Sequence, residues 1–254
     1  MACASLGFIS IAGYNPADRQ RADLLAPGDV ISYIEMCREE GASLQHGMNF
    51  RLGSQTSVLL MSLRRGAPYA DRIEDEGKTL IYEGHDIPRR QGGPEPKQTD
   101  QPMYLPSSKL SRNGLFFEAA IKAKKGEAAP ELVKVYEKVQ NGVWVFDGFF
   151  ELLDAWQEQS GDRKVFKFKL VLKEGLSGPS STDAIDLPHS RLIPTAVKLE
   201  VWKRDAGKCT KCGRRDNLHF DHLLPYSKGG SSLLASNIQL LCARHNLEKH
   251  DRIE

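Results

Sequence analysis

The sequence predicts an α+β chain, in which a β-rich amino-terminal domain precedes a small carboxyl-terminal domain stapled by a metal ion. Residues 133–139 and 165–171 alternate apolar and polar side chains with a period of two, as half-buried strands do. Residues 57–63 form a continuous apolar run, typical of a buried strand. Near the carboxyl end, a Cys-x-x-Cys pair is followed about thirty residues later by Cys-x-x-His, the spacing of a tetrahedral zinc site.

The other elements fit this class. A helical stripe is expected from Val30 to Gly41, a strand and turn over 79–84 and a helix over 113–123. Residues 149–159 predict a strand end or turn and a short element. Residues 87–110, with five prolines and two adjacent glycines, predict a long surface loop. Many strands and few helices favour a β-barrel-like domain.

The chain divides by composition into two domains and a linker. Residues 173–195 are rich in proline, glycine and serine, and predict a linker between a domain at 1–172 and one at 196–254. Residues 196–205 predict a helix that leads into the first cysteine pair.

The composition bounds the function. The net charge of the 254 residues is only +2, but residues 187–254 carry 12 Lys and Arg against 7 Asp and Glu, which suits a polyanionic partner. No run of about 18 apolar residues predicts a membrane span, and the start lacks the pattern of a signal peptide. Five cysteines, three of them in metal spacing, predict a reducing compartment.

Cys209, Cys212, Cys242 and His245 are the expected ligands of a closed, structural Zn²⁺ site. The polar residues between and after the two half-sites are too regularly placed for a zinc knuckle alone. This part of the chain resembles the HNH (ββα-metal) nucleases, which present one histidine and one divalent metal to a scissile phosphate. The residues that carry the resemblance are Asp221-His222-Leu-Leu-Pro225, Lys228-Gly229-Gly230-Ser231, Asn237-Ile-Gln-Leu-Leu-Cys242 and His245-Asn246.

The resemblance implies a role for each of these residues. His222 would be the general base, because a neutral imidazole titrates near the working pH. Asp221 and Asn246 would hold one Mg²⁺ or Mn²⁺, with His250, one helical turn further, as the alternative to Asn246. Asn237 would serve the catalytic site by tying the loop or orienting the His222 backbone. A purely structural zinc finger is the competing interpretation.

Residues from about 27 to 172 resemble the SRA (YDG) domain, a PUA-like β-barrel that reads modified cytosine. The residues that carry this resemblance are Pro68-Tyr69-Ala-Asp71 to Gly77, Tyr82-Glu-Gly84, Thr99-Asp100-Gln101, Arg112-Asn113-Gly-Leu, Val145-Phe146-Asp147-Gly148-Phe149 and Val165 to Leu170. The family's Tyr-Asp-Gly signature is here Phe146-Asp147-Gly148, and the spacing from Tyr69 to Tyr82 is one residue longer than in eukaryotic members.

The SRA resemblance implies a pocket for a base that is swung out of the duplex. Tyr69 and Tyr82 would stack on the base and Asp71 would accept from the cytosine amino group; without the resemblance, the two tyrosines would be taken for core residues. Arg89 and Arg90 in the long loop would contact the DNA backbone. Arg244 and Lys249 are further candidates for phosphate contacts.

Together the two resemblances imply a modification-dependent restriction endonuclease of the bacterial cytoplasm. Its substrate would be double-stranded DNA with 5-methylcytosine or 5-hydroxymethylcytosine. A non-catalytic reader with a structural zinc module and an unselective HNH nuclease are the alternatives. One HNH site cuts one strand, so a double-strand break would need a homodimer or two events.

Overall fold

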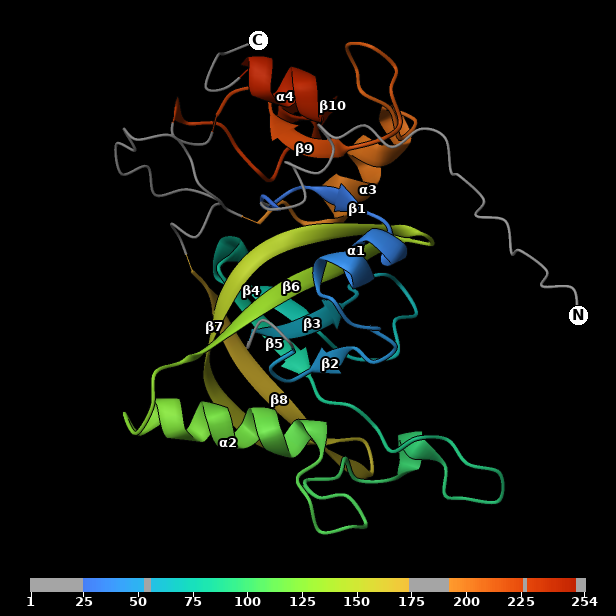
Figure 1. Ribbon diagram of the computed structural model, residues 1–254, viewed down its shortest axis with the longest axis vertical. Coiled ribbons are helices and arrows are strands. Elements are labelled where there is room, and N and C mark those ends of the chain that lie inside the picture. The colour runs from blue at the N-terminus through green and yellow to red at the C-terminus, as the bar shows by residue number, and fades with distance from the viewer. Residues whose placement is uncertain (1–24, 53–55, 174–191, 226–227, 250–254) are drawn as a thin grey trace, which may run out of the picture.

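The computed structural model describes residues 25–52, 56–173, 192–225 and 228–249 (Figure 1). The strands are β1 (Val30–Ile31), β2 (Met48–Asn49), β3 (Ser57–Met61), β4 (Arg72–Glu74), β5 (Thr79–Glu83), β6 (Glu131–Gln140), β7 (Val143–Ser160), β8 (Arg163–Leu172), β9 (Leu218–His222) and β10 (Ile238–Cys242). The α-helices are α1 (Tyr33–Glu39), α2 (Arg112–Lys124), α3 (Thr195–Arg204) and α4 (Ala243–Lys249). No helix in these ranges is long and apolar enough to cross a membrane.

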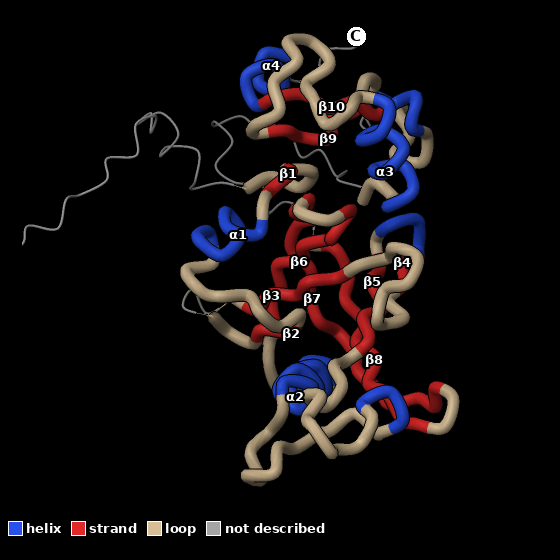
Figure 2. The backbone as a smooth tube through the Cα atoms, turned by 90° about the vertical axis from the view of Figure 1, so that its right-hand side faces the viewer, coloured by secondary structure: helices blue, strands red, loops and turns tan. Residues whose placement is uncertain are grey.

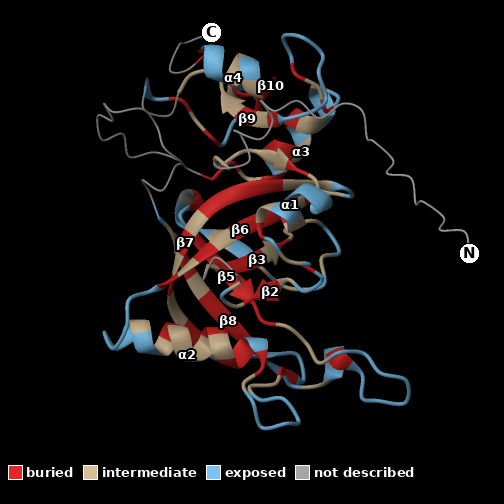
Figure 3. Cartoon of the chain, in the orientation of Figure 1, coloured by how far each residue is buried: buried red, intermediate tan, exposed pale blue. Residues whose placement is uncertain are grey.

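An eight-stranded sheet forms the amino-terminal part, in the order β2-β3-β6-β7-β8-β5-β4, with β1 added to β7. Only β3 and β6 pair in parallel. The long strands β7 and β8 bend, so that the sheet wraps around its core and α2 closes one end (Figures 1 and 3). Alternate residues of β6 and β8, such as Val133, Val135, Phe166 and Phe168, supply that core, as their period of two predicts. The α+β class with a sheet-rich amino-terminal domain is therefore confirmed.

Strand β7 contains a β-bulge at the Phe146-Asp147-Gly148 motif. Val135 pairs with Gly148 while the next residue, Tyr136, pairs with Phe146, so Asp147 is the extra residue. Gly148 has φ +111°, a conformation that glycine adopts without strain. Residues 147–148 therefore belong to a bulge within a strand of 18 residues, which also contains the whole of 149–159.

The carboxyl-terminal part consists of α3, the β9–β10 hairpin and α4, the expected ββα arrangement. In Figures 1 and 2 this module lies against one end of the sheet, with β1 between β9 and β7. Its apolar residues share one cluster with the sheet, since Val139 and Val145 pack with Val201, Phe220 and Leu240. Most of the predicted linker lies outside the described residues.

Candidate functional site

Four metal-ligating side chains converge between the hairpin and α4. Cys209 and Cys212 follow α3, Cys242 ends β10, and His245 lies in the first turn of α4. Their ligand atoms lie within 4.8 Å of one another; Cys212 Sγ is 3.8 Å from Cys242 Sγ, which is 3.4 Å from His245 Nδ1. Zinc–sulfur bonds of about 2.3 Å in a tetrahedron give ligand separations of about 3.7 Å. The cluster therefore fits a four-coordinate zinc ion.

The chemistry of Cys209 also suits zinc. Burial raises the pKa of this thiol, but hydrogen bonds from the Cys242 and Cys212 backbone and from His245 outweigh it, so the pKa falls to about 6. The thiolate is the form that binds metal.

Asp221 and His222 end strand β9 and reach one small cavity. Successive strand residues usually point to opposite faces, and both residues are among those that line one cavity of about 110 Å³. Asp221 Oδ2 lies 2.9 Å from Lys249 Nζ. His222 Nε2 lies 2.8 Å from the hydroxyl of Ser232, a residue that is 2% exposed. The adjacent carboxylate and imidazole thus lie beside one cavity, and each has a partner that fixes its orientation.

The His222 imidazole is held in its neutral form. Burial lowers its pKa, His219 and Lys249 lower it further, and only Asp221 opposes them. A neutral imidazole offers a lone pair at neutral pH, which is the requirement for a general base.

Asn237 and Gly230 shape the loop beside the pair. The Asn237 side chain accepts from the Leu224 amide (2.9 Å) and donates to the carbonyls of Leu224 (3.0 Å) and Ser231 (3.1 Å). A Cβ at Gly230 would lie 1.7 Å from the Leu224 carbonyl oxygen, so only glycine fits there. Asn237 therefore ties the loop and makes no direct contact with the cavity.

Helix α4 closes the site from the other side. Lys249, 1% exposed, also donates to the His222 carbonyl at 2.5 Å. Asn246 is half-buried and precedes Lys249 by three residues, which places both on one helix face. The Asp221 carboxylate and the Asn246 amide are oxygen donors of the kind that Mg²⁺ and Mn²⁺ prefer. His250 lies outside the described residues.

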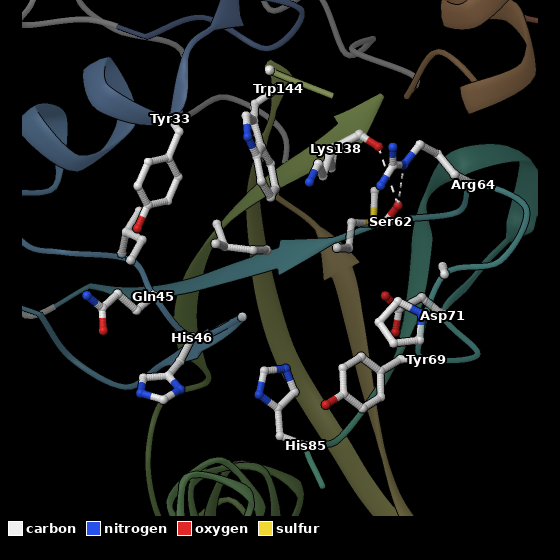
Figure 4. A pocket seen from close by; sticks show the side chains of 17 residues that line it. Tyr33, Gln45, His46, Ser62, Arg64, Tyr69, Asp71, His85, Lys138 and Trp144 are labelled. Carbon is white, nitrogen blue, oxygen red and sulfur yellow. Dashed lines mark hydrogen bonds between the residues drawn. The ribbon is translucent and has the colours of Figure 1, made fainter. Parts of the chain in front are cut away.

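A second cavity, of about 500 Å³, opens in the sheet domain (Figure 4). Tyr69 and Asp71 line it together with His85, whose ring stacks on Tyr69 at 4.9 Å between centroids and 7° between planes. Asp71 accepts from the Glu83 amide at 2.9 Å. Burial raises the pKa of Asp71 to about 7 and lowers that of His85 to about 4. The other labelled side chains around the cavity are Tyr33, Gln45, His46, Ser62, Arg64, Lys138 and Trp144.

Tyr82 does not line this cavity, contrary to the expectation. Its side chain is 1% exposed in the core of the sheet, because all five residues of β5 are buried. Its hydroxyl lies 3.0 Å from His85 Nε2 and donates to the Leu60 carbonyl at 3.2 Å. Tyr82 thus supports the ring of His85 from below the cavity wall. His85 lines the cavity where Tyr82 was expected.

Comparison with known proteins assigns the carboxyl-terminal module. Residues 209–252 match the family model described as HNH endonuclease. The matched residues, called the HNH segment below, contain the four side chains of the Cys and His cluster as well as Asp221, His222 and Asn246. No curated protein matches the chain.

Solved structures resemble the rest of the chain at low identity. They include the SRA domain of SUVH5 with fully methylated CG DNA (21% identity, 59% of this chain, 91% of that chain, TM-score 0.41). A second is the modification-dependent TagI restriction endonuclease (18% identity, 88% of this chain, 77% of that chain, TM-score 0.38).

Of the four cations expected at the DNA backbone, one is placed differently from the expectation. Lys249 is not available to a phosphate, because its ammonium group is buried against Asp221 in the HNH segment. Arg89 pairs with Glu95 at 2.7 Å on the exposed loop, and neither it nor Arg90 lines the large cavity. Arg244 is exposed and pairs with Glu248. Arg90 and Arg244 lie on the surface, where DNA-backbone contact stays a prediction.

The sequence reasoning missed His85 and Ser232. Asn113 fixes the His85 backbone from both sides, since it accepts from its amide and donates to its carbonyl, each at 2.8 Å. Asn113 belongs to one of the motifs quoted for the SRA resemblance, and its hydrogen bonds to His85 explain one such motif physically. Ser232 directly follows the Gly-Gly-Ser turn, and only the folded loop brings it to His222.

Proposed function

We propose that this chain is a modification-dependent DNA endonuclease that reads a modified cytosine in the large cavity and cuts with the HNH segment. The observation that carries the nuclease half is the convergence of Asp221 and His222 on one cavity, beside a zinc-type cluster, within residues that match the HNH family. The reader half rests on the Tyr69, Asp71 and His85 wall of the large cavity.

His222 acts as the general base in this proposal. In the tautomer that carries its hydrogen on Nε2, His222 donates to the Ser232 hydroxyl, which leaves the lone pair of Nδ1 to take a proton from the attacking water. Asp221 and Asn246 would hold a divalent ion, which supplies charge stabilisation for the phosphate and the leaving oxygen when it is bound. Lys249 keeps the Asp221 carboxylate oriented, and the zinc cluster keeps the hairpin against α4.

The large cavity takes a base that has left the duplex. Unstacking costs about a few kcal/mol, and stacking on an aromatic ring recovers about 1–3 kcal/mol per base. Tyr69 and the neutral His85 ring provide such surfaces, and ionised Asp71 accepts from the exocyclic amino group of cytosine. The volume of about 500 Å³ leaves room for a methyl or hydroxymethyl substituent.

The experiment compares binding and cleavage on three matched duplexes that carry cytosine, 5-methylcytosine or 5-hydroxymethylcytosine, in Mg²⁺ and in Mn²⁺. The proposal predicts cutting of the modified duplexes, loss of cutting in His222→Ala with binding retained, and loss of discrimination in Asp71→Ala. Selective binding without any cleavage would establish a non-catalytic reader. Equal cleavage of all three duplexes would establish an unselective nuclease.

A further inference from the structure

One buried lysine joins the two domains. Lys198 of α3 reaches into the sheet, where its Nζ lies 2.6 Å from Glu137 Oε2 and 2.5 Å from Asp147 Oδ1. All three side chains are 1% exposed, and Thr195 also donates to Glu137. A buried ammonium group that lost these carboxylates would be left without compensation, so the contact resists separation of the domains.

The bulge in β7 explains how Asp147 reaches Lys198. A bulge re-aims the side chain of its extra residue, and Asp147 is that residue. Burial raises the pKa of Asp147 to about 7 although Lys198 lowers it. Near neutral pH the protonated form of Asp147 is therefore accessible, which reduces the negative charge buried beside the single ammonium group.

A second tie runs through the backbone of Gly28 and Asp29. The Gly28 amide donates to the Phe146 carbonyl in β7 (2.8 Å), and the Gly28 carbonyl accepts from the Phe220 amide in β9 (3.0 Å). The Asp29 carboxylate meets His219 Nδ1 at 2.9 Å. This short segment is thus hydrogen-bonded to the eight-stranded sheet on one side and to the catalytic strand on the other. Strand β1, which follows it, lies between β9 and the sheet in Figure 2.

The two cavities share strand β7. Trp144 lines the large cavity, and Asp147 lines the small cavity beside Asp221 and His222. Three residues of extended chain span about 10 Å. The reading and cutting sites therefore lie on one continuous piece of structure, with the Lys198 network at the end that borders the small cavity.

We infer that the eight-stranded sheet with its proposed reading site (the reader sheet) and the carboxyl-terminal part made of α3, β9, β10 and α4 (the HNH module) act as one rigid body. In this arrangement Lys198 fixes the position of the cut relative to the modified base. The inference rests on the proposed function. A rigid body predicts a narrower spread of cut positions than a nuclease on a flexible tether. A flexible linker of roughly 20 residues would let a nuclease wander over about 25 Å, which spreads cuts over about seven phosphates at about 3.4 Å each.

The test maps cut positions by end sequencing on a duplex with a single 5-methylcytosine. We expect the wild-type chain to cut at one or two adjacent phosphates. Insertion of about ten Gly-Ser residues within 174–191 should leave the position unchanged, because the linker does not set it. Lys198→Met should spread the cuts over about five or more phosphates. Lys203→Met, an exposed lysine on the same helix, is the matched control and should cut like the wild type.

If Lys198→Met does not fold, Gly28→Val tests the same contact between the domains. A Cβ at Gly28 would lie 3.0 Å from both His219 Cε1 and the Phe220 carbonyl oxygen, so valine wedges the domains apart. Scattered cuts by the wild type, or a shift on linker insertion, would overturn the inference. So would unchanged positions in both Lys198→Met and Gly28→Val.

Hydrogen exchange tests the junction without relying on activity. The amides of Gly28 and Phe220 should exchange at least about ten-fold faster in Lys198→Met than in Lys203→Met. If the wild type cuts no DNA while these amides behave as expected, the proposed function fails and the rigid junction stands. Equal exchange rates in the two variants would show that Lys198 does not hold the two domains together.

Discussion

The ammonium group of Lys249 lies 2.9 Å from the Asp221 carboxylate that we assign to a divalent ion. The lysine side chain is 1% exposed and that of Asp221 is 16% exposed. A positive charge of the protein thus already neutralises the carboxylate that a metal ion would bind. The two cations stabilise the same group, so the contribution of Lys249 should depend on metal.

Replacement of Lys249 by methionine tests this relationship. We expect a loss of about 2–3 kcal/mol of stability in a chelator, below the usual cost of breaking a fully buried pair because Asp221 is partly exposed. The loss should shrink with saturating Mn²⁺, which takes over the neutralisation of Asp221. Thermal unfolding with and without Mn²⁺ measures both values. Arg244→Met on the same helix is the control, and a loss that is independent of metal would contradict the assignment.

Zinc content is the second prediction. Mass spectrometry of the native protein should find one zinc ion per chain, and Cys242→Ser should lose it together with cooperative unfolding of the HNH module. Cys37→Ser is the matched control, because this free thiol lies in the sheet domain away from the cluster. Full zinc occupancy in Cys242→Ser would show that the four ligands do not form the site.

The affinity for modified DNA should depend on pH through the ionisation of Asp71. Its folded pKa of about 7 lies above the ordinary value, so the ionised, hydrogen-accepting form grows as the pH rises through 7, while the stability contributed by the protonated form is lost. The affinity for the modified duplex should therefore rise about ten-fold between pH 6 and pH 8. Asp71→Asn, an acceptor at every pH, should show a flat profile. A flat wild-type profile would exclude Asp71 as the amino-group acceptor.

Ser232 is expected to position His222. Ser232→Ala should slow cleavage about ten-fold through kcat, with KM and zinc content unchanged, because the imidazole loses the partner that fixes its ring. Ser232→Thr should restore the rate. Ser231→Ala is the control, since its hydroxyl bonds the Leu233 amide and not His222. A purely structural role would lower the melting temperature without the split between kcat and KM.

The sequence predicted what depends on local pattern. The alternation in β6 and β8 and the Cys-x-x-Cys and Cys-x-x-His spacing each follow from a few neighbouring residues, and the structure has these strands and this cluster. Strand β7 was predicted only in part, because residues 149–159 were expected to form a strand end or turn and a short element, whereas bulges at Asp147 and Leu153 let one strand continue through them. A bulge is stabilised by its partner strand, which a local pattern does not contain.

Long-range contacts were beyond such patterns. Lys198 reads as an ordinary helical lysine, and its partners Glu137 and Asp147 lie 61 and 51 residues away. Tyr82 was expected at the cavity, but His85 lines it instead, because the burial of both faces of β5 keeps the Tyr82 ring in the core. The sequence predicted a phosphate contact for Lys249. Its burial was not predictable from a local pattern, because it depends on how α4 packs against β9.

The most direct measurement is the initial rate of strand cleavage on two duplexes that differ only in one 5-methyl group, with His222→Ala in parallel. The account predicts that the wild type cuts the methylated duplex at least about ten-fold faster, and that the variant binds it equally well yet cuts neither duplex. Cleavage by His222→Ala at the wild-type rate, or equal rates on the two duplexes, would contradict it.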